Sequence, residues 1–270
     1  MLIRLGYNIV FEQSAPVPMI LLLSAYPSDT LVFRQPDVLC IEPQVDCMEY
    51  RDSFGNRCHR LTAPAGRLRL WNSFVVEHSG EADSAVWTAR QHLIEELPGE
   101  TLPFLLASRY CEVDMLSDIA WQLFGHTPLG WARVQAISDW VHQHVRYDAE
   151  FARPTKTAYD VYQDGGGVCR DFQHLAIAFC RSLNIPARYV SGYLGDIGIP
   201  LDGRPMDFHA WFEVYLGGEW HTFDARHNRP RIGRVAMARG RDAVDVALTT
   251  SFGTNQLAWF EVIAEEVGSL

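Results

Sequence analysis

The sequence predicts an α+β protein in which an antiparallel β sandwich precedes a mixed helical and β region. Residues 1 to about 95 contain many short apolar segments separated by prolines and polar turns, a pattern typical of an antiparallel sandwich. After residue 112, apolar residues recur at helical spacing, and a β-hairpin pattern follows near residue 210. We therefore expect a β-sandwich domain over 1–95, a linker over 96–112 and a second domain over 113–270.

Composition and charge limit the classes of function. The 270 residues carry 23 Lys and Arg against 33 Asp and Glu, for a net charge of −10. Because no basic run stands out, we expect neither nucleic-acid nor membrane binding. The early apolar run 17–25 is broken by Pro18 and is too short to cross a bilayer, and no basic leader precedes it. These observations predict a cytoplasmic protein.

The six cysteines point to free thiols, since no secretion signal accompanies them. No CxxC pair or HExxH motif is present, so we expect neither a metal site nor another cofactor.

The expected strands of the first region are short apolar stretches bounded by turn residues. They cover residues 2–11, 19–25, 38–41, 45–50, 58–62, 67–78 and 85–88. No cluster of chemically active residues occurs there. We expect this domain to serve packing or the orientation of substrate.

Two helices are expected next. The first has an apolar stripe at positions 116, 119, 120 and 123, and Thr127-Pro128 is expected to open the second. The stripe of the second helix falls at positions 134, 137 and 141.

A glycine-rich turn introduces the most informative stretch, Gly165-Gly166-Gly167-Val168-Cys169. Apolar residues at 172, 175, 176, 179 and 183 then predict a helix whose first turn holds Cys169. A helix N-terminus favours a thiolate, so we expect the pKa of Cys169 to be depressed. The alternative interpretation is a buried structural cysteine.

A β-hairpin supplies the candidate base. Residues 209–216 alternate between two faces, Gly217-Gly218 forms a two-residue turn, and 219–224 returns. This loop length pairs Leu216 with Glu219, which places His209 and Asp224 diagonally on one face, about 7 Å apart. A carboxylate on one ring nitrogen would orient His209 toward a nucleophile.

Other carboxylates compete for that role. Asp207 lies two residues before His209, Glu213 lies further along the same strand, and Asp171 lies on the cysteine helix, where it could cap the helix or pair with Arg170. That the hairpin packs across the start of the cysteine helix is an assumption at this point. With it, the thiol and imidazole form a nucleophile–base pair.

Several segments resemble the transglutaminase-like superfamily of cysteine enzymes, in its bacterial branch with an N-terminal β domain. The matching segments are 108–110, 166–172, 174–175, 184–193, 207–211 and 220–224. The resemblance implies a papain-like α+β core with Cys169, His209 and Asp224 as a catalytic triad. Substrate or oxyanion candidates are Gln163, Tyr147 and Trp211.

The expected function is hydrolysis of amide or peptide bonds through a thioester acyl-enzyme, with a peptide or protein as substrate. Transglutaminase-type transfer from glutamine-like amides to amines is the alternative, because the same triad serves both reactions. A non-catalytic interaction module is the third possibility.

Overall fold

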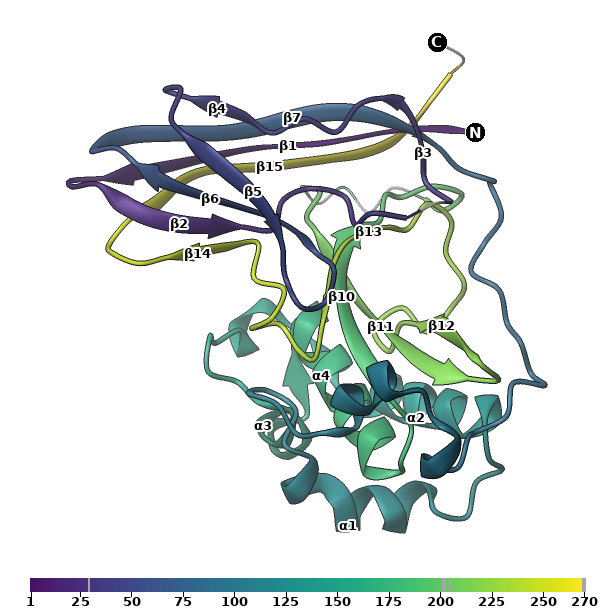
Figure 1. The fold of residues 1–270 in the computed structure, drawn as a ribbon. Coiled ribbons are helices and arrows are strands. Elements are labelled where there is room, and N and C mark those ends of the chain that lie inside the picture. The colour runs from purple at the N-terminus through teal and green to yellow at the C-terminus, as the bar shows by residue number, and fades with distance from the viewer. Residues whose placement is uncertain (29, 201–202, 204, 269–270) are drawn as a thin grey trace.

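Two antiparallel sheets pack face to face in the upper half of Figure 1, where the computed structural model describes residues 1–28, 30–200, 203 and 205–268. One sheet has the order β15-β1-β7-β3, with β4 also paired to β7, and the other has the order β14-β2-β6-β5. The strands of the first sheet are β1 (Leu2–Gln13), β3 (Val32–Gln35), β4 (Cys40–Glu42), β7 (Gly66–Glu77) and β15 (Gln256–Val267). Those of the second are β2 (Val17–Leu21), β5 (Cys47–Arg51), β6 (Arg57–Ala63) and β14 (Thr249–Ser251).

Alternation of side chains along the strands builds the core of this sandwich. Every second residue of β1, from Ile3 to Phe11, is buried and packs against apolar side chains of β2, β6 and β7. The expected antiparallel sandwich is confirmed. The expected strand over 85–88 is wrong, since those residues form a turn and irregular chain.

The end of the chain returns to the beginning. β15 runs antiparallel to β1 along almost its whole length, and β14 pairs with β2. The sandwich therefore contains residues 249–267, which the sequence analysis placed in the second domain. The division near residues 95 and 113 remains a proposal, to which this C-terminal return must be added.

Between the two halves the chain forms irregular structure and two 3₁₀ helices, η1 (Ile94–Glu96) and η2 (Gly99–Leu105). The lower half contains α1 (Val113–Phe124), α2 (Trp131–His144), α3 (Ala158–Asp164) and α4 (Cys169–Ser182). The second helix begins at Trp131 and not at Thr127-Pro128. Thr127 belongs to a turn, in which its hydroxyl donates to the Phe124 carbonyl at 2.7 Å and its own carbonyl accepts from Arg133.

A third antiparallel sheet connects the helices to the sandwich. Its order is β12 (Glu219–Phe223), β11 (His209–Leu216), β10 (Ala187–Tyr193) and β13 (Val235–Gly240). α4 lies on one face of this sheet and contacts α1, α2 and α3 as well. Almost every residue of α4 after its first turn is buried, so the start of this helix is held in place by packing on all sides.

The far end of the third sheet enters the core of the sandwich. Tyr193 of β10 and Val235 and Met237 of β13 are buried in the same apolar cluster as β1 and β7. The two halves therefore share a core. Within the described residues, no helix has the length and apolar character needed to cross a membrane.

Candidate active site

The glycine-rich turn positions Cys169, and each glycine has its own reason to be there. Gly165 ends α3 in the left-handed conformation, with φ +62°. Gly166 and Gly167 form β9, which pairs in parallel with β8 (Arg146–Tyr147). A Cβ on Gly166 would lie 2.9 Å from the Phe151 ring, and one on Gly167 would lie 2.6 Å from the Cβ of Asp171.

Asp171 fixes the first turn of α4. Its carboxylate accepts a 2.9 Å hydrogen bond from the Val168 backbone N–H and is paired with the Arg170 guanidinium at 3.0 Å. Arg170 in turn donates to the Arg153 carbonyl and lies 5.3 Å from the centre of the Tyr110 ring. Asp171 therefore caps the helix, and its partners are not histidines.

Cys169 is the first residue of α4 and is half-buried. Burial raises the pKa of its thiol, and the charges of Asp207 and Asp224 act in the same direction. The positive charge of Arg226 and a hydrogen bond from the Arg170 backbone N–H lower the pKa without offsetting the loss of water. The expected depression of the pKa of Cys169 is thus wrong, because burial outweighs these two effects and raises the pKa.

The hairpin has the predicted register, with Leu216 opposite Glu219 and Phe212 opposite Phe223. On the other side of β11, His209 pairs with Gly192 of β10. The Nδ1 atom of His209 is buried and has no hydrogen-bond partner among the described residues. Burial lowers the pKa of His209 to about 3, assisted by the charges of His227 and Arg226 and opposed by that of Asp224.

Two charged side chains affect the pKa of both the Cys169 thiol and the His209 imidazole. The charges of Arg226 and Asp224 each act on Cys169 and on His209. Both groups come from the loop that follows β12, and α4 packs against β11. Gln173 of α4 bonds to Asp224 at 3.1 Å, and the His209 ring centre lies 5.3 Å from that of His227, so the start of α4, the start of β11 and the end of β12 lie together.

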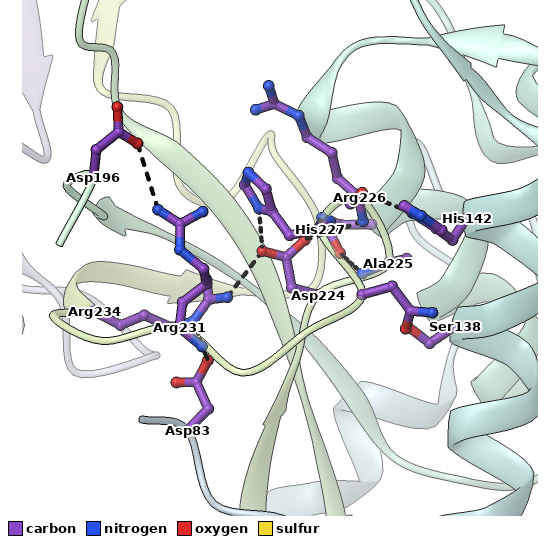
Figure 2. Close-up of polar contacts among 12 residues, drawn as sticks. Asp83, Ser138, His142, Asp196, Asp224, Ala225, Arg226, His227, Arg231 and Arg234 are labelled. Carbon is purple, nitrogen blue, oxygen red and sulfur yellow. Dashed lines mark hydrogen bonds and ion pairs between the residues drawn. The ribbon is translucent and has the colours of Figure 1, made fainter. Parts of the chain in front are cut away.

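The Asp224 carboxylate, however, is occupied by other partners than His209. One oxygen, Oδ2, accepts from His227 Nδ1 at 2.8 Å and from Arg234 Nη2 at 2.9 Å (Figure 2). The other, Oδ1, accepts from Gln173 Nε2 at 3.1 Å and from the backbone N–H groups of Arg226 and His227. Burial alone would raise the pKa of Asp224, but the bond from His227 and the charge of Arg234 hold it below its ordinary value.

Helix α2 fixes the loop that carries Asp224. The Asn228 side chain bonds to Gln135, Ser138 and Asp139, and the Asn228 backbone N–H closes a turn onto the Asp224 carbonyl at 2.8 Å. His142 holds the Arg226 carbonyl at 2.8 Å, as Figure 2 also shows. The carboxylate is therefore supported by a rigid segment and not by a mobile loop.

Sequence reasoning missed four polar residues of this site: Gln173, Arg226, His227 and Arg234. A signal existed for Gln173, which follows Cys169 by four positions and therefore lies on the same face of α4. The other three lie beyond the last residue of the hairpin pattern, where side-chain alternation no longer predicts position.

The remaining candidates lie in different surroundings. Tyr147 pairs with Gly167 across β8 and β9, and the Arg226 guanidinium lies 4.0 Å from the centre of its ring. Trp211 is only 2% exposed and lies beneath Arg234. Gln163 is exposed on α3 and lines a separate cavity of about 410 Å³ with side chains of α2 and α4.

The competing carboxylates also have other partners. Glu213 is paired with Arg188 at 2.6 Å and Arg239 at 3.0 Å. Asp207 accepts from the Phe208 backbone N–H and acts on Cys169 through its charge.

Comparison with known proteins gives one match over part of the chain and one over the whole chain. The core of the transglutaminase-like superfamily matches residues 120–225. A crystal structure from Cytophaga hutchinsonii, described as that of a "putative cysteine protease", is 30% identical and has a TM-score of 0.84, with 100% of this chain and 91% of that chain covered.

Two curated relatives match over shorter stretches. The uncharacterized protein ML0607 of Mycobacterium leprae is 32% identical over 119 residues, which are 42% of each chain. The kyphoscoliosis peptidase of Mus musculus is 32% identical over 100 residues, 34% of this chain and 15% of that protein. The matches span less than half the length of these two relatives. The full-length match to the Cytophaga protein and the family match over the core show that this chain belongs to the transglutaminase-like superfamily.

Proposed function

We propose that the protein is a cysteine-nucleophile hydrolase of amide or peptide bonds, with Cys169, His209 and Asp224 as its triad. The observation that carries the proposal is that Asp224 is bonded both to Gln173, one helical turn after Cys169, and to His227, whose ring lies 5.3 Å from that of His209. Nucleophilic catalysis requires the thiol and the imidazole to come within hydrogen-bond reach of each other, and a shared carboxylate partner between their two elements supports that placement.

In this mechanism the resting thiol and imidazole are both neutral. His209 accepts the Sγ proton as the sulfur attacks the amide carbonyl carbon, and it returns that proton to the departing amine. The acyl group remains on Cys169 as a thioester. His209 then takes a proton from water, the resulting hydroxide attacks the thioester, and the acid leaves while the proton returns to the sulfur.

The negative charge that develops on the carbonyl oxygen needs hydrogen-bond donors. The backbone N–H of Cys169 lies in the first turn of α4, where helical N–H groups have no partner within the helix. We assign one oxyanion donor to this group. Tyr147, beside Arg226 and opposite Gly167, is our candidate for contact with the substrate.

The cellular compartment of the protein and the identity of the acyl acceptor are proposals as well. All six cysteines lie in the described part of the chain and none forms a disulfide, which suits a reducing compartment. We therefore propose a cytoplasmic enzyme. We propose water as the second nucleophile, with transfer to an amine as the outcome that would replace it.

The test compares the wild-type protein with Cys169→Ala on a peptide library, with new N-termini and released ammonia measured by mass spectrometry and a coupled assay. The proposal requires that cleavage disappears in Cys169→Ala while circular dichroism stays unchanged. Cys47→Ser, which alters an exposed thiol on β5, should keep full activity. Equal cleavage by Cys169→Ala would refute the proposal.

A fluorescent primary amine added to the same reaction separates hydrolysis from acyl transfer. Hydrolysis leaves the peptides unlabelled. Incorporation of the amine that depends on Cys169 would show that the protein is a transferase.

A further inference from the structure

Two imidazole rings lie side by side in the site. The ring centres of His209 and His227 are 5.3 Å apart, with 35° between the ring planes. The His227 side chain is 16% exposed, so its ring lies at the border of the site. The proposed mechanism uses His209 and gives no role to His227.

The carboxylate that should serve His209 is bonded to His227 instead. Asp224 Oδ2 receives His227 Nδ1 at 2.8 Å, whereas the buried Nδ1 of His209 has no partner among the described residues. Asp224 does not need His227 to stay in place, because Arg234, Gln173 and two backbone N–H groups also hold it. The bond from His227 is therefore not needed to keep the carboxylate in place. What it sets is which of the two imidazoles is bonded to the carboxylate.

Other ionisable groups surround this pair on several elements. His227 shares its loop with Arg226, and Asp224 receives Arg234 from the segment before β13. The further groups are Cys169 on α4, Asp207 before β11, His142 on α2, Arg231 beside Arg234, and Asp83 from the connection that follows β7. The Arg234 guanidinium donates to Asp83 at 2.8 Å as well as to Asp224, so the two carboxylates share its positive charge.

We propose that His227 is a positioning residue: it holds the Asp224 carboxylate while the thiol is protonated and releases it to His209 when His209 accepts the thiol proton. The inference rests on the proposed function, because it assumes that His209 is the base for Cys169. It explains why the buried Nδ1 of His209 has no partner in the part of the chain that the structure describes.

The exchange conserves protons. The Sγ–H bond breaks as an Nε2–H bond forms on His209, which makes the ring a cation with a proton on each nitrogen. Asp224 Oδ2 then gives up the hydrogen bond from His227 Nδ1–H and accepts one from His209 Nδ1–H. His227 keeps its own proton throughout, so it directs the carboxylate and is not a proton carrier.

Alkylation of Cys169 by iodoacetamide tests this inference without a known substrate. The rate is measured from pH 5 to 9 by peptide mass spectrometry, which separates Cys169 from the other thiols. His227→Phe removes the donor but keeps a ring, whereas His227→Asn keeps an N–H at the position of Nδ1, the atom that bonds to the carboxylate. Melting temperature and circular dichroism report whether each variant folds.

His227→Phe frees Asp224 for His209, so the thiolate–imidazolium pair becomes more populated. We expect Cys169 in this variant to react about tenfold faster at pH 6, which corresponds to one pKa unit. His227→Asn should follow the wild-type profile. The ¹⁵N chemical shifts of the His209 ring should show its pKa raised in His227→Phe alone.

Two results would overturn the inference: an unchanged profile in His227→Phe, or equal changes in the Phe and Asn variants. A third variant, His209→Ala, distinguishes a wrong role for His227 from a wrong assignment of the Cys169–His209 pair. If His209→Ala leaves the alkylation profile unchanged, the Cys169–His209 pair itself is refuted. If His209→Ala alters the profile and His227→Phe does not, only the role of His227 is refuted. His142→Gln, which removes another support of the same loop, should not reproduce the effect.

Discussion

Replacement of His209 by Gln should make the protein less sensitive to acid. Burial, together with the charges of His227 and Arg226, lowers the pKa of His209 to about 3. In the unfolded chain the same imidazole has the ordinary histidine pKa of 6.5. Between these two pH values the unfolded chain binds one proton more than the folded protein at this residue.

The sign and size follow from proton linkage. Because the unfolded state binds the extra proton, falling pH favours unfolding, by about 1.4 kcal/mol per pH unit for one proton. From pH 6.5 to 5.0, His209 should therefore remove about 2 kcal/mol from the free energy of unfolding. Above pH 7.5 it should contribute no slope, because the imidazole is neutral in both states.

Urea unfolding of the wild-type protein and His209→Gln at pH 8.5, 7.5, 6.0 and 5.0 measures this effect. Between pH 7.5 and 5.0, the variant should lose about 2 kcal/mol less than the wild type. His174 and His59, whose pKa values burial also lowers, are present in both proteins and cancel in the difference. Parallel acid losses in the two proteins would refute the assignment of His209 as a buried neutral base.

Two further substitutions test how the start of the cysteine helix is built. Gly167→Ala places a methyl group 2.6 Å from the Cβ of Asp171, so we expect the free energy of unfolding to fall by about 1–3 kcal/mol. Gly99→Ala is the control, because its methyl group meets open space and should change the free energy of unfolding by less than about 0.5 kcal/mol. Similar losses in the two variants would contradict this close contact. Arg226→Ala removes a positive charge that lowers the pKa of Cys169, so alkylation at pH 8 should slow by about threefold and recover in Arg226→Lys. A rate that is independent of this charge would count against its action on the thiol.

The hairpin shows what the sequence can predict at residue level. A two-residue Gly-Gly turn leaves one register for strands of strict alternation, so the pairing of Leu216 with Glu219 follows from local chemistry alone. The helix that begins at Cys169 is equally local, since its apolar spacing and the preceding glycines lie within twenty residues. The candidate nucleophile, Cys169, and the candidate base, His209, could therefore be predicted from the sequence alone.

The partner of Asp224 could not be predicted in the same way. The His209 ring lies next to that of His227, but the carboxylate is bonded to His227, and this pairing depends on the loop after β12. Side chains of α2, some ninety residues earlier in the chain, hold that loop in place. Alternation along a strand says nothing about a segment that has left the strand.

The return of β15 to β1 is a second long-range feature. Its residues lie more than 240 positions from their partners, and most of the first half of the strand is exposed on the sheet edge, so alternation gives little signal. The sequence therefore predicted the sandwich but not the strands that complete it. Pairings of this kind are decided by tertiary packing and not by local propensity.

The pKa of Cys169 shows how burial can reverse a local electrostatic preference. The helix start and Arg226 favour the thiolate, but removal from water favours the thiol more strongly. Since burial also keeps His209 neutral, proton transfer from sulfur to imidazole is uphill in the resting protein. In the proposed mechanism the groups that offset this cost act mainly in the transition state: Asp224 on the imidazolium and the N–H of Cys169 on the oxyanion. In such a site the thiol would react more slowly than an exposed thiol until an amide is bound, which would favour substrates that reach the start of α4.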